Sequence, residues 1–318
     1  MKIVDLFSGC GGLSLGFQNA GFEIICAYDN WSHAFETYKK NFNHPIYNLD
    51  LSDEKNYAHI KQHNADIIIG GPPCQDFSSA GKRNENNGRA DLTIHFANII
   101  ALNKPKWFVM ENVQQITKSN TLIKAKEIFK NSNYGLSQVI LNASLCGVPQ
   151  NRKRFFLIGE LNGLDNTLTS LLSDNQNTKP MSVFDYLGNS LKTEHYYRHP
   201  RSYERRGIFS IYEPSPTIRG VNRPIPPKYN FHKGDTVKDF SKVRPLTQKE
   251  RSYLQTFPES FEFIGAKTNV EQMIGNAVPV KLAEYLATNL KGYINKTIKP
   301  KKNRYIQTEL RVTVANNV

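Results

Sequence analysis

One cysteine lies in a loop that is suited to hold its side chain still. Cys74 follows Gly70-Gly71-Pro72-Pro73, directly after the apolar, β-branched run at residues 66–69. Such a run is typical of a strand buried on both faces of a parallel sheet, and open α/β sheets bind ligands at the carboxyl ends of their strands. The glycines allow close approach and the prolines fix φ. The pattern favours a nucleophilic thiol, with a buried structural cysteine in a plain turn as the alternative.

Acidic side chains follow two further predicted strands. Strands at residues 2–7 and 23–28 flank a glycine-rich turn at 8–12 and a helix at 13–19, which is the first βα unit of a nucleotide-binding sheet. The turn is not a dinucleotide fingerprint, because Ser14 replaces the third glycine. Asp29 ends the second strand, where a carboxylate suits a ribose diol, and Asp50 would accept a hydrogen bond from an exocyclic amine. Singly, such acids are more often caps or surface residues.

A carboxylate and two arginines complete the candidate chemistry. Glu111 ends the predicted strand at 107–110, after a helix at 92–102, and should lie at the same edge of the sheet as Cys74. It could protonate a ring nitrogen while the thiolate attacks nearby, or simply cap a helix. Arg152 and Arg154 alternate into the predicted strand at 155–159, beside another at 136–142, so both should lie on one face. They would hold a phosphate or a base edge, or form surface ion pairs.

Composition indicates a soluble globular protein. The chain of 318 residues is 39% hydrophobic and 22% charged, and it has neither a bilayer-spanning run nor a signal peptide. Its four cysteines show neither zinc spacing nor a disulfide framework, so we expect a cytoplasmic protein without a metal.

The net charge of +13 is gathered in two stretches. Residues 198–244 hold eleven Lys and Arg against four acids, residues 291–311 hold seven against one, and the rest sums to zero. This concentration indicates a polyanion partner. Because no amphipathic helix accompanies the charge, nucleic acid is favoured over a membrane.

Five ordered motifs resemble those of the cytosine-5 DNA methyltransferases, especially the compact enzymes of bacterial restriction–modification systems. The resemblance covers nearly the whole chain, and five motifs in register are far more specific than one. It implies an α/β fold, with a Rossmann-like sheet that binds S-adenosylmethionine and a smaller β-rich target-recognition domain. The motifs are Asp5-Leu6-Phe7-Ser8-Gly9, Pro72-Pro73-Cys74-Gln75, Glu111-Asn112-Val113, Gln150-x-Arg152-x-Arg154 and Gly275-Asn276-Ala277-Val278-Pro279.

The resemblance also implies roles for individual residues. Cys74 would add to carbon 6 of a flipped cytosine, so that carbon 5 takes the methyl group of S-adenosylmethionine before elimination restores the ring. Glu111, supported by Asn112, would engage the ring nitrogen and exocyclic amine, while Arg152 and Arg154 hold the base and position Cys74. Pro73 and Gln75 would complete the catalytic set. The implied cofactor pocket comprises Phe7, Ser8, Gly9, Gly11, Gly12, Asp29, Asn30, Asp50, Pro72, Asn276 and Val278. Many family members carry an aromatic residue directly after the ribose acid, whereas this chain has Asn30 and then Trp31, which leaves the adenine-covering role of Trp31 open.

The predicted domains follow from composition and from the resemblance together. A catalytic and cofactor-binding domain at 1–165 would be completed by residues 270–292, within a helical stretch at 270–290. Residues 162–182 are polar and typical of a linker, and 183–244 are basic, punctuated by prolines, and would form the target-recognition domain. A helix is predicted at 248–255, and residues 293–318 form a basic tail.

The basic domain carries the predicted DNA contacts. We expect Arg219 or Arg223 to contact bases and Arg201, Arg205 and Arg206 to contact phosphates, while phosphate contacts by all five are the alternative. Ser78 is a further DNA-binding candidate. The expected partner is duplex DNA, with a cognate restriction endonuclease acting separately and the chain itself monomeric.

Three other functions compete with this interpretation. A dinucleotide-dependent oxidoreductase would use the same first turn, but the missing glycine and the Cys74 loop argue against it. A catalytically dead DNA-binding module is disfavoured by the complete set of Cys74, Glu111 and the arginines. A tRNA cytosine-5 methyltransferase is the nearest alternative, and the basic segment of roughly sixty residues favours duplex DNA over it.

Overall fold

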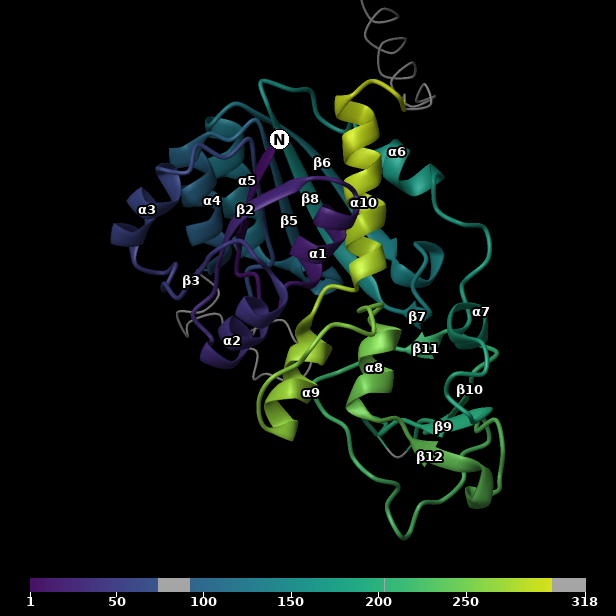
Figure 1. The fold of residues 1–318 in the computed structure, drawn as a ribbon. Helices are drawn as coiled ribbons and strands as arrows, with labels where there is room; N and C mark the ends of the chain where they lie inside the picture. Colours follow the sequence, from purple (N-terminus) through teal and green to yellow (C-terminus); the bar gives the residue numbers. More distant parts are fainter. Residues whose placement is uncertain (74–91, 203, 299–318) are drawn as a thin grey trace, which may run out of the picture.

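A seven-stranded sheet forms the centre of the molecule (Figure 1). The computed structural model describes residues 1–73, 92–202 and 204–298. The strand order is β3-β2-β1-β4-β5-β8-β6. The pairings from β3 through β5 are parallel, whereas β8 runs antiparallel to both of its neighbours, β5 and β6. The strands are β1 (Lys2–Leu6), β2 (Glu23–Tyr28), β3 (Ile46–Tyr47), β4 (Ile67–Gly70), β5 (Trp107–Val113), β6 (Tyr134–Asn142) and β8 (Lys153–Leu161).

Helices cover both faces of this sheet, as its apolar strands require. In β4, Ile67 and Ile69 pack into the hydrophobic cluster that contains α1 and α10, while Ile68 packs into the cluster that contains α4 and α5. Figure 1 shows these two helix layers on opposite sides of the strands. The predicted α/β class is therefore confirmed. One layer comprises α1 (Gly12–Asn19), α6 (Thr169–Asp174) and α10 (Val280–Ile294), and the other α3 (Tyr57–Lys61), α4 (Leu92–Asn103) and α5 (Asn120–Asn131).

The strand order reverses at the centre of the sheet. β1 lies between β2 and β4, so the chain moves outward in opposite directions from this point. In open α/β sheets, ligands bind outside the carboxyl ends of the strands at such a point. The glycine turn after β1 and the Gly71-Pro72-Pro73 loop after β4 both lie at this point.

Residues 183–262 form a second, less regular region below the sheet in Figure 1. A small sheet of order β10-β9-β12 has its own apolar cluster around Tyr197, Ile208 and Tyr229. Most of the region's other apolar side chains share a cluster with helix α2 (Ser32–Asn41) of the first βα units. The region thus packs over a continuous core on the body that contains the seven-stranded sheet. Its elements are α7 (Val183–Leu187), β9 (His195–Tyr197), β10 (Ile208–Ser210), β11 (Ser215–Pro216), β12 (Val243–Pro245) and α8 (Gln248–Leu254), and β11 pairs with β7 (Gln150–Asn151).

Three sequence predictions about local structure are wrong. Residues 162–182 are not a linker throughout, because helix α6 buries Leu168, Leu171 and Leu172 against the sheet. The predicted helix at 270–290 is two helices, α9 (Lys267–Asn276) and α10, because Pro279 cannot continue the hydrogen-bond ladder and Ala277 is extended. Strand β5 continues through Glu111 to Val113, since these residues pair with β8.

Within the three described ranges, no helix has both the length and the apolar character needed to cross a bilayer.

Candidate active site

The glycine turn after β1 closes onto the carboxyl-terminal motif. A Cβ on Gly12 would lie 2.2 Å from the Val278 carbonyl oxygen, so only glycine permits this approach. Phe7 begins the turn with a left-handed φ of 55°, a conformation that costs energy for a bulky residue. Residues 7–12 and Val278, which the sequence assigned to one pocket, therefore lie together.

Asp29 fixes this turn from the end of β2. Its Oδ2 accepts a hydrogen bond from the Gly9 N–H at 2.7 Å, and its Oδ1 accepts one from the Trp31 N–H at 2.9 Å. Burial raises the pKa of Asp29, while these two backbone donors oppose that shift. Asp29 thus sets the shape of the turn, and each of its oxygens has a second lone pair for another donor. Asn30 beside it is exposed, and Trp31 is half-buried.

The space beside Gly9 is suited to a polar ligand. An added Cβ on Gly9 would meet no atom within 4 Å, although its neighbours in the turn are buried. The hydroxyl of Ser8 is buried there without a hydrogen-bond partner. Asn276 is exposed at the end of α9, next to Val278. An orphaned hydroxyl, an open cradle and an exposed amide are what a nucleoside with an amino-acid tail would use, so the residues present fit S-adenosylmethionine.

Asp50 lies at the outer end of this edge, after β3. It is exposed, and its Oδ1 accepts hydrogen bonds from the Ser52 N–H at 2.9 Å and the Ser52 hydroxyl at 2.7 Å. These bonds lower the pKa of Asp50, because they favour the charged carboxylate. The group is therefore an ionised acceptor at neutral pH.

Glu111 and Arg154 form a buried ion pair between neighbouring strands. The Arg154 Nε lies 2.9 Å from the Glu111 Oε1, with side chains 14% and 11% exposed. The pKa of Glu111 is raised by burial, even though Arg154 and Arg152 oppose the shift, and burial likewise lowers the pKa of Arg154. Desolvation thus outweighs the mutual attraction of the pair. A carboxyl group that keeps its proton to higher pH is suited to general-acid chemistry.

The same carboxyl group faces the loop that leads to Cys74. A Cβ on Gly71 would lie 3.2 Å from the Glu111 Oε2. Asn112 donates from its side-chain amide to the Pro72 carbonyl at 3.1 Å, which ties this loop to β5. Pro72 is buried and Pro73 is exposed. The predicted residues Cys74, Gln75 and Ser78 lie outside the described part of the chain.

Arg152 is directed toward the backbone of other segments. Its side chain is 1% exposed, its Nη1 donates to the Ile218 carbonyl, and its Nη2 donates to the carbonyls of Gly275 and Ala277, each at 3.0 Å. Its positive charge is still close enough to Glu111 to oppose the rise in pKa that burial causes there. The structure therefore gives the two predicted arginines different environments: Arg154 pairs with the acid, and Arg152 joins three segments.

Several basic residues of the 183–262 region lie near one another. Repulsion from Arg219, Arg201 and Arg251 adds to burial in lowering the pKa of Arg198 to about 10. Arg223 is exposed and, with Arg219 and Arg198, helps to lower the pKa of His199. Arg198 donates to the Thr217 carbonyl at 2.7 Å and Arg219 to the His199 carbonyl at 2.5 Å, so each fixes the other's segment. We call Arg198, His199, Arg201, Arg219 and Arg223 the basic cluster.

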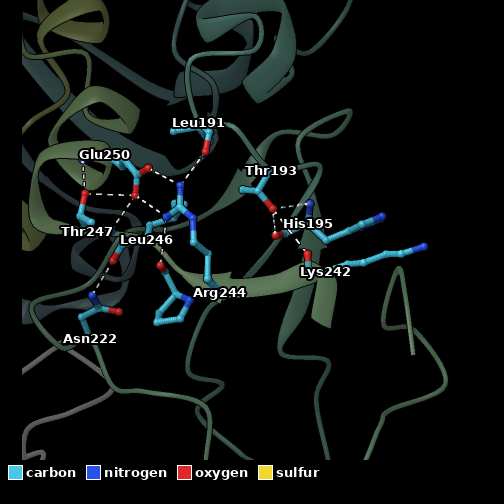
Figure 2. Close-up of polar contacts among 10 residues, drawn as sticks. Leu191, Thr193, His195, Asn222, Lys242, Arg244, Leu246, Thr247 and Glu250 are labelled. Atoms are coloured by element: carbon cyan, nitrogen blue, oxygen red, sulfur yellow. Dashed lines mark hydrogen bonds and ion pairs between the residues drawn. The ribbon is translucent and has the colours of Figure 1, made fainter. Parts of the chain in front are cut away.

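The remaining predicted DNA contacts are placed differently. Arg205 is exposed, whereas Arg206 forms an ion pair of 2.5 Å with Glu213 and stacks on Phe209 with its guanidinium 4.3 Å from the ring centre. Figure 2 shows a comparable internal contact of Arg244, which binds Glu250 at 2.5 and 2.8 Å. Both arginines hold the small sheet in place.

Sequence reasoning assigned no role to three buried residues, Gln150, Arg251 and Gln255. Gln150 was only a motif position, Arg251 lies in α8, and Gln255 is the residue that ends this helix. Their partners are backbone and side-chain atoms of other segments, which leaves no local signal. Across the described ranges, no group of three His, Cys, Asp or Glu side chains is arranged to hold a metal ion.

Comparison with known proteins shows one consistent similarity. The family model for C-5 cytosine-specific DNA methylase matches residues 1–292. The type II methyltransferase M.HindV of Haemophilus influenzae is 63% identical over 290 residues, covering 91% of this chain and 95% of that protein. M.HgiDI of Herpetosiphon aurantiacus is 55% identical over 296 residues, covering 93% and 96%. Among solved structures, the S. pombe Dnmt2 methyltransferase shares the fold with a TM-score of 0.70 at 20% identity, covering 93% of this chain and 99% of that one.

Proposed function

Because the chain belongs to the C-5 cytosine-specific DNA methylase family and is a DNA (cytosine-5-)-methyltransferase, we propose that it methylates a flipped-out cytosine of duplex DNA through a covalent bond to Cys74, with S-adenosylmethionine as the methyl donor. One observation carries the proposal: the buried Glu111–Arg154 pair faces the loop that leads to Cys74, at the point where the sheet order reverses. This is where the chemistry needs an acid beside a nucleophile.

The residues of the pair would act on the base. The Cys74 thiolate forms a bond to carbon 6 as the ring's double bond opens, while the Glu111 carboxyl hydrogen-bonds the ring nitrogen and supplies its proton. Arg154 would orient that carboxyl group. Its positive charge would stabilise the carboxylate that remains when the proton leaves. Once carbon 5 has taken the methyl group, solvent removes the carbon 5 proton as the thiolate leaves carbon 6, and the ring nitrogen returns its proton to the Glu111 carboxylate, which restores the ring.

The methyl donor would lie along the glycine turn. S-adenosylmethionine, when bound, supplies an activated methyl group at the sulfonium. Ser8 would offer its unpartnered hydroxyl, Gly9 its open backbone, and Asn276 its exposed amide, while Gly11 lets the turn pack against the Phe42 ring. Each oxygen of Asp29 accepts one backbone hydrogen bond and has a second lone pair, so Asp29 would both shape the turn and accept from the ribose diol, while the neighbouring Trp31 would cover the adenine.

The basic cluster would recognise the DNA. Residues 183–244 would form the target-recognition domain, in which Arg201 and Arg223 are exposed near the more enclosed Arg198 and Arg219. Sequence preference would come from base contacts within this cluster, and Arg205 would add phosphate contacts. We further propose that the chain works as a cytoplasmic monomer in a restriction–modification system, beside a separate endonuclease that cuts the same site.

The decisive experiment tests the covalent step. Purified protein should transfer tritiated methyl groups from S-adenosylmethionine to duplex DNA, and Cys74→Ala should abolish this while the melting temperature stays within about 2 °C. Wild type should also form a denaturant-resistant adduct with DNA that contains 5-fluorocytosine, because fluorine cannot leave as the proton does. Transfer to tRNA in place of DNA, or activity in Cys74→Ala, would refute the proposal.

A further inference from the structure

A short segment of the 183–262 region is attached by its main chain to β7, the two-residue strand that precedes β8. β11 pairs in parallel with β7, and the Ser215 N–H donates to the Pro149 carbonyl at 2.9 Å. The Thr217 hydroxyl donates to the Asn151 carbonyl at 2.8 Å. We call residues 215–223 the bridging segment, because they connect this motif to Arg219 and Arg223 of the basic cluster.

Two motif side chains bind both backbone polar groups of one residue in this segment. The Ile218 N–H donates to the Gln150 Oε1 at 2.9 Å, while the Ile218 carbonyl accepts from Arg152 at 3.0 Å. Gln150 is 0% exposed and Ile218 is 3% exposed. With no water to replace these bonds, losing one would leave a buried polar group unsatisfied. The position of Ile218 is therefore determined by residues 150–152, which lead directly into β8 and Arg154.

Gln150 is itself held by a second buried amide. Its Nε2 donates to the Gln255 Oε1 at 2.8 Å and to the Leu254 carbonyl at 3.0 Å. Gln255 in turn donates to the carbonyls of Ile274 and Ala277. A continuous path of hydrogen bonds thus runs from Ile218 to both sides of Asn276, the proposed cofactor contact.

The backbone packing around the path is equally close. A Cβ on Gly275 would lie 2.1 Å from the Gly220 nitrogen and 2.3 Å from the Arg219 carbonyl carbon. On the far side, Asn222 donates to the Leu246 carbonyl at 2.9 Å, as Figure 2 shows, and to Glu271 at 3.2 Å. The bridging segment is therefore held at residues 215, 217, 218, 220 and 222.

We propose that Gln150 and Gln255 are positioning residues that hold the bridging segment in register with the active site, and that they thereby determine how strictly the enzyme selects its DNA site. Both side chains are 0% exposed, so each would act through the segment that it holds. Their amide hydrogen bonds fix Ile218 relative to the active site. If these bonds are lost and Ile218 shifts, Arg219 and Arg223 shift with it relative to the Glu111–Arg154 pair. When the arginines contact the correct bases, the target cytosine is then no longer correctly placed. Methylation of the cognate site therefore falls by more than methylation of near-cognate sites. This inference rests on the proposed function.

The test compares three glutamine substitutions in cells that express the full chain. Gln150→Met and Gln255→Met keep side-chain volume but remove the amide hydrogen bonds, whereas Gln138→Met changes an exposed glutamine whose bond goes only to Lys126. Genome-wide mapping of methylated cytosines gives the ratio of methylation at the cognate motif to that at sites differing by one base. We expect this ratio to fall roughly tenfold in the first two variants, the lower end of what one base contact contributes, and to stay within twofold in the control.

A double variant separates positioning from simple destabilisation. If the two amides act as one path, Gln150→Met/Gln255→Met should lose about as much discrimination as either single variant, since the path is already broken. Destabilisation alone would lower methylation at all sites in proportion and leave the ratio unchanged. An unchanged ratio in both single variants, or additive losses in the double variant, would overturn the proposal.

A measurement on the wild-type protein covers the case in which the variants do not fold. Binding of S-adenosylmethionine should slow amide hydrogen exchange in peptides covering residues 215–222 more than in those covering β10, which lies off the path. Equal protection of both peptides would refute the coupling. If wild type binds the cofactor but methylates no DNA, the proposed function fails; if it methylates one motif and the variants keep its strictness, only the positioning role fails.

Discussion

Replacing Glu111 by Gln tests the acid at the centre of the site. The substitution keeps the shape and one acceptor oxygen but removes both the charge and the transferable proton. General acids typically contribute 10²–10⁴-fold, so we expect single-turnover methyl transfer to slow by about 10²-fold or more, which is about 2.7 kcal/mol of transition-state free energy.

The same substitution should also affect stability, through Arg154. With side chains 14% and 11% exposed, the pair is nearly buried, and removing one partner of such a pair costs up to about 3–5 kcal/mol. Because the glutamine oxygen can still accept from the Arg154 Nε, we expect the free energy of unfolding to fall by about 1–3 kcal/mol, below that limit.

Two assays separate these effects. Urea unfolding measures the loss of the ion pair, and single-turnover transfer at saturating S-adenosylmethionine measures the acid. Glu160→Gln is the matched control, because Glu160 lies at the other end of the same strand pair and should leave the rate within twofold. A rate loss below tenfold in Glu111→Gln would refute the acid role. A parallel collapse of cofactor affinity, measured by calorimetry, would place Glu111 in the wrong pocket.

Three further predictions follow from buried charges. The single-turnover rate should decline as pH rises through the raised pKa of Glu111, since the active form is protonated, and the profile of Glu111→Gln should lack that decline. Burial raises the pKa of Asp5 to about 8, above its ordinary value of 3.8. Its contribution to stability is therefore complete below about pH 4 and is lost as pH rises to about 8. The free energy of unfolding of Asp5→Asn, measured with urea, should depend less steeply on pH in that window, by up to roughly 1.4 kcal/mol per pH unit. Arg251→Met should cost about 3–5 kcal/mol in urea unfolding because it leaves the buried Glu271 unpaired, and Arg251→Met/Glu271→Met should recover most of that loss.

Local chemistry made the strands of the sheet predictable. The strand predicted at residues 23–28 corresponds to β2, because its β-branched and apolar residues are bounded by Gly21 and Asp29. The same sequence logic failed at residues 162–182, where many polar side chains mask three leucines that pack on the sheet. It failed again at the helix break, where apolar spacing continues across Pro279.

The site was predictable to the extent that strand ends determine it. Glu111 beside the Cys74 loop follows from strand order alone. The bonds of Gln150 could not be predicted, because they join a side chain to the main chain of Ile218, which is 68 residues away. Every residue has the same backbone groups, so the sequence does not show which of them a glutamine side chain will bind. A glutamine with this role therefore cannot be told from any other by its neighbours in the sequence.

The packing of α1 against α10 governs when the enzyme can form during its synthesis. A Cβ on Gly16 would lie 2.3 Å from that of Ala283, and Lys291 donates to the Ala20 carbonyl at 2.9 Å, 271 residues earlier in the chain. At about 5–20 residues per second, the ribosome needs roughly 14–54 s to make that interval. Throughout that time the apolar face of α1 has no α10 to cover it. A nascent chain therefore stays accessible to chaperones until α10 emerges, and a translation product that ends before α10 cannot complete the methyltransferase core.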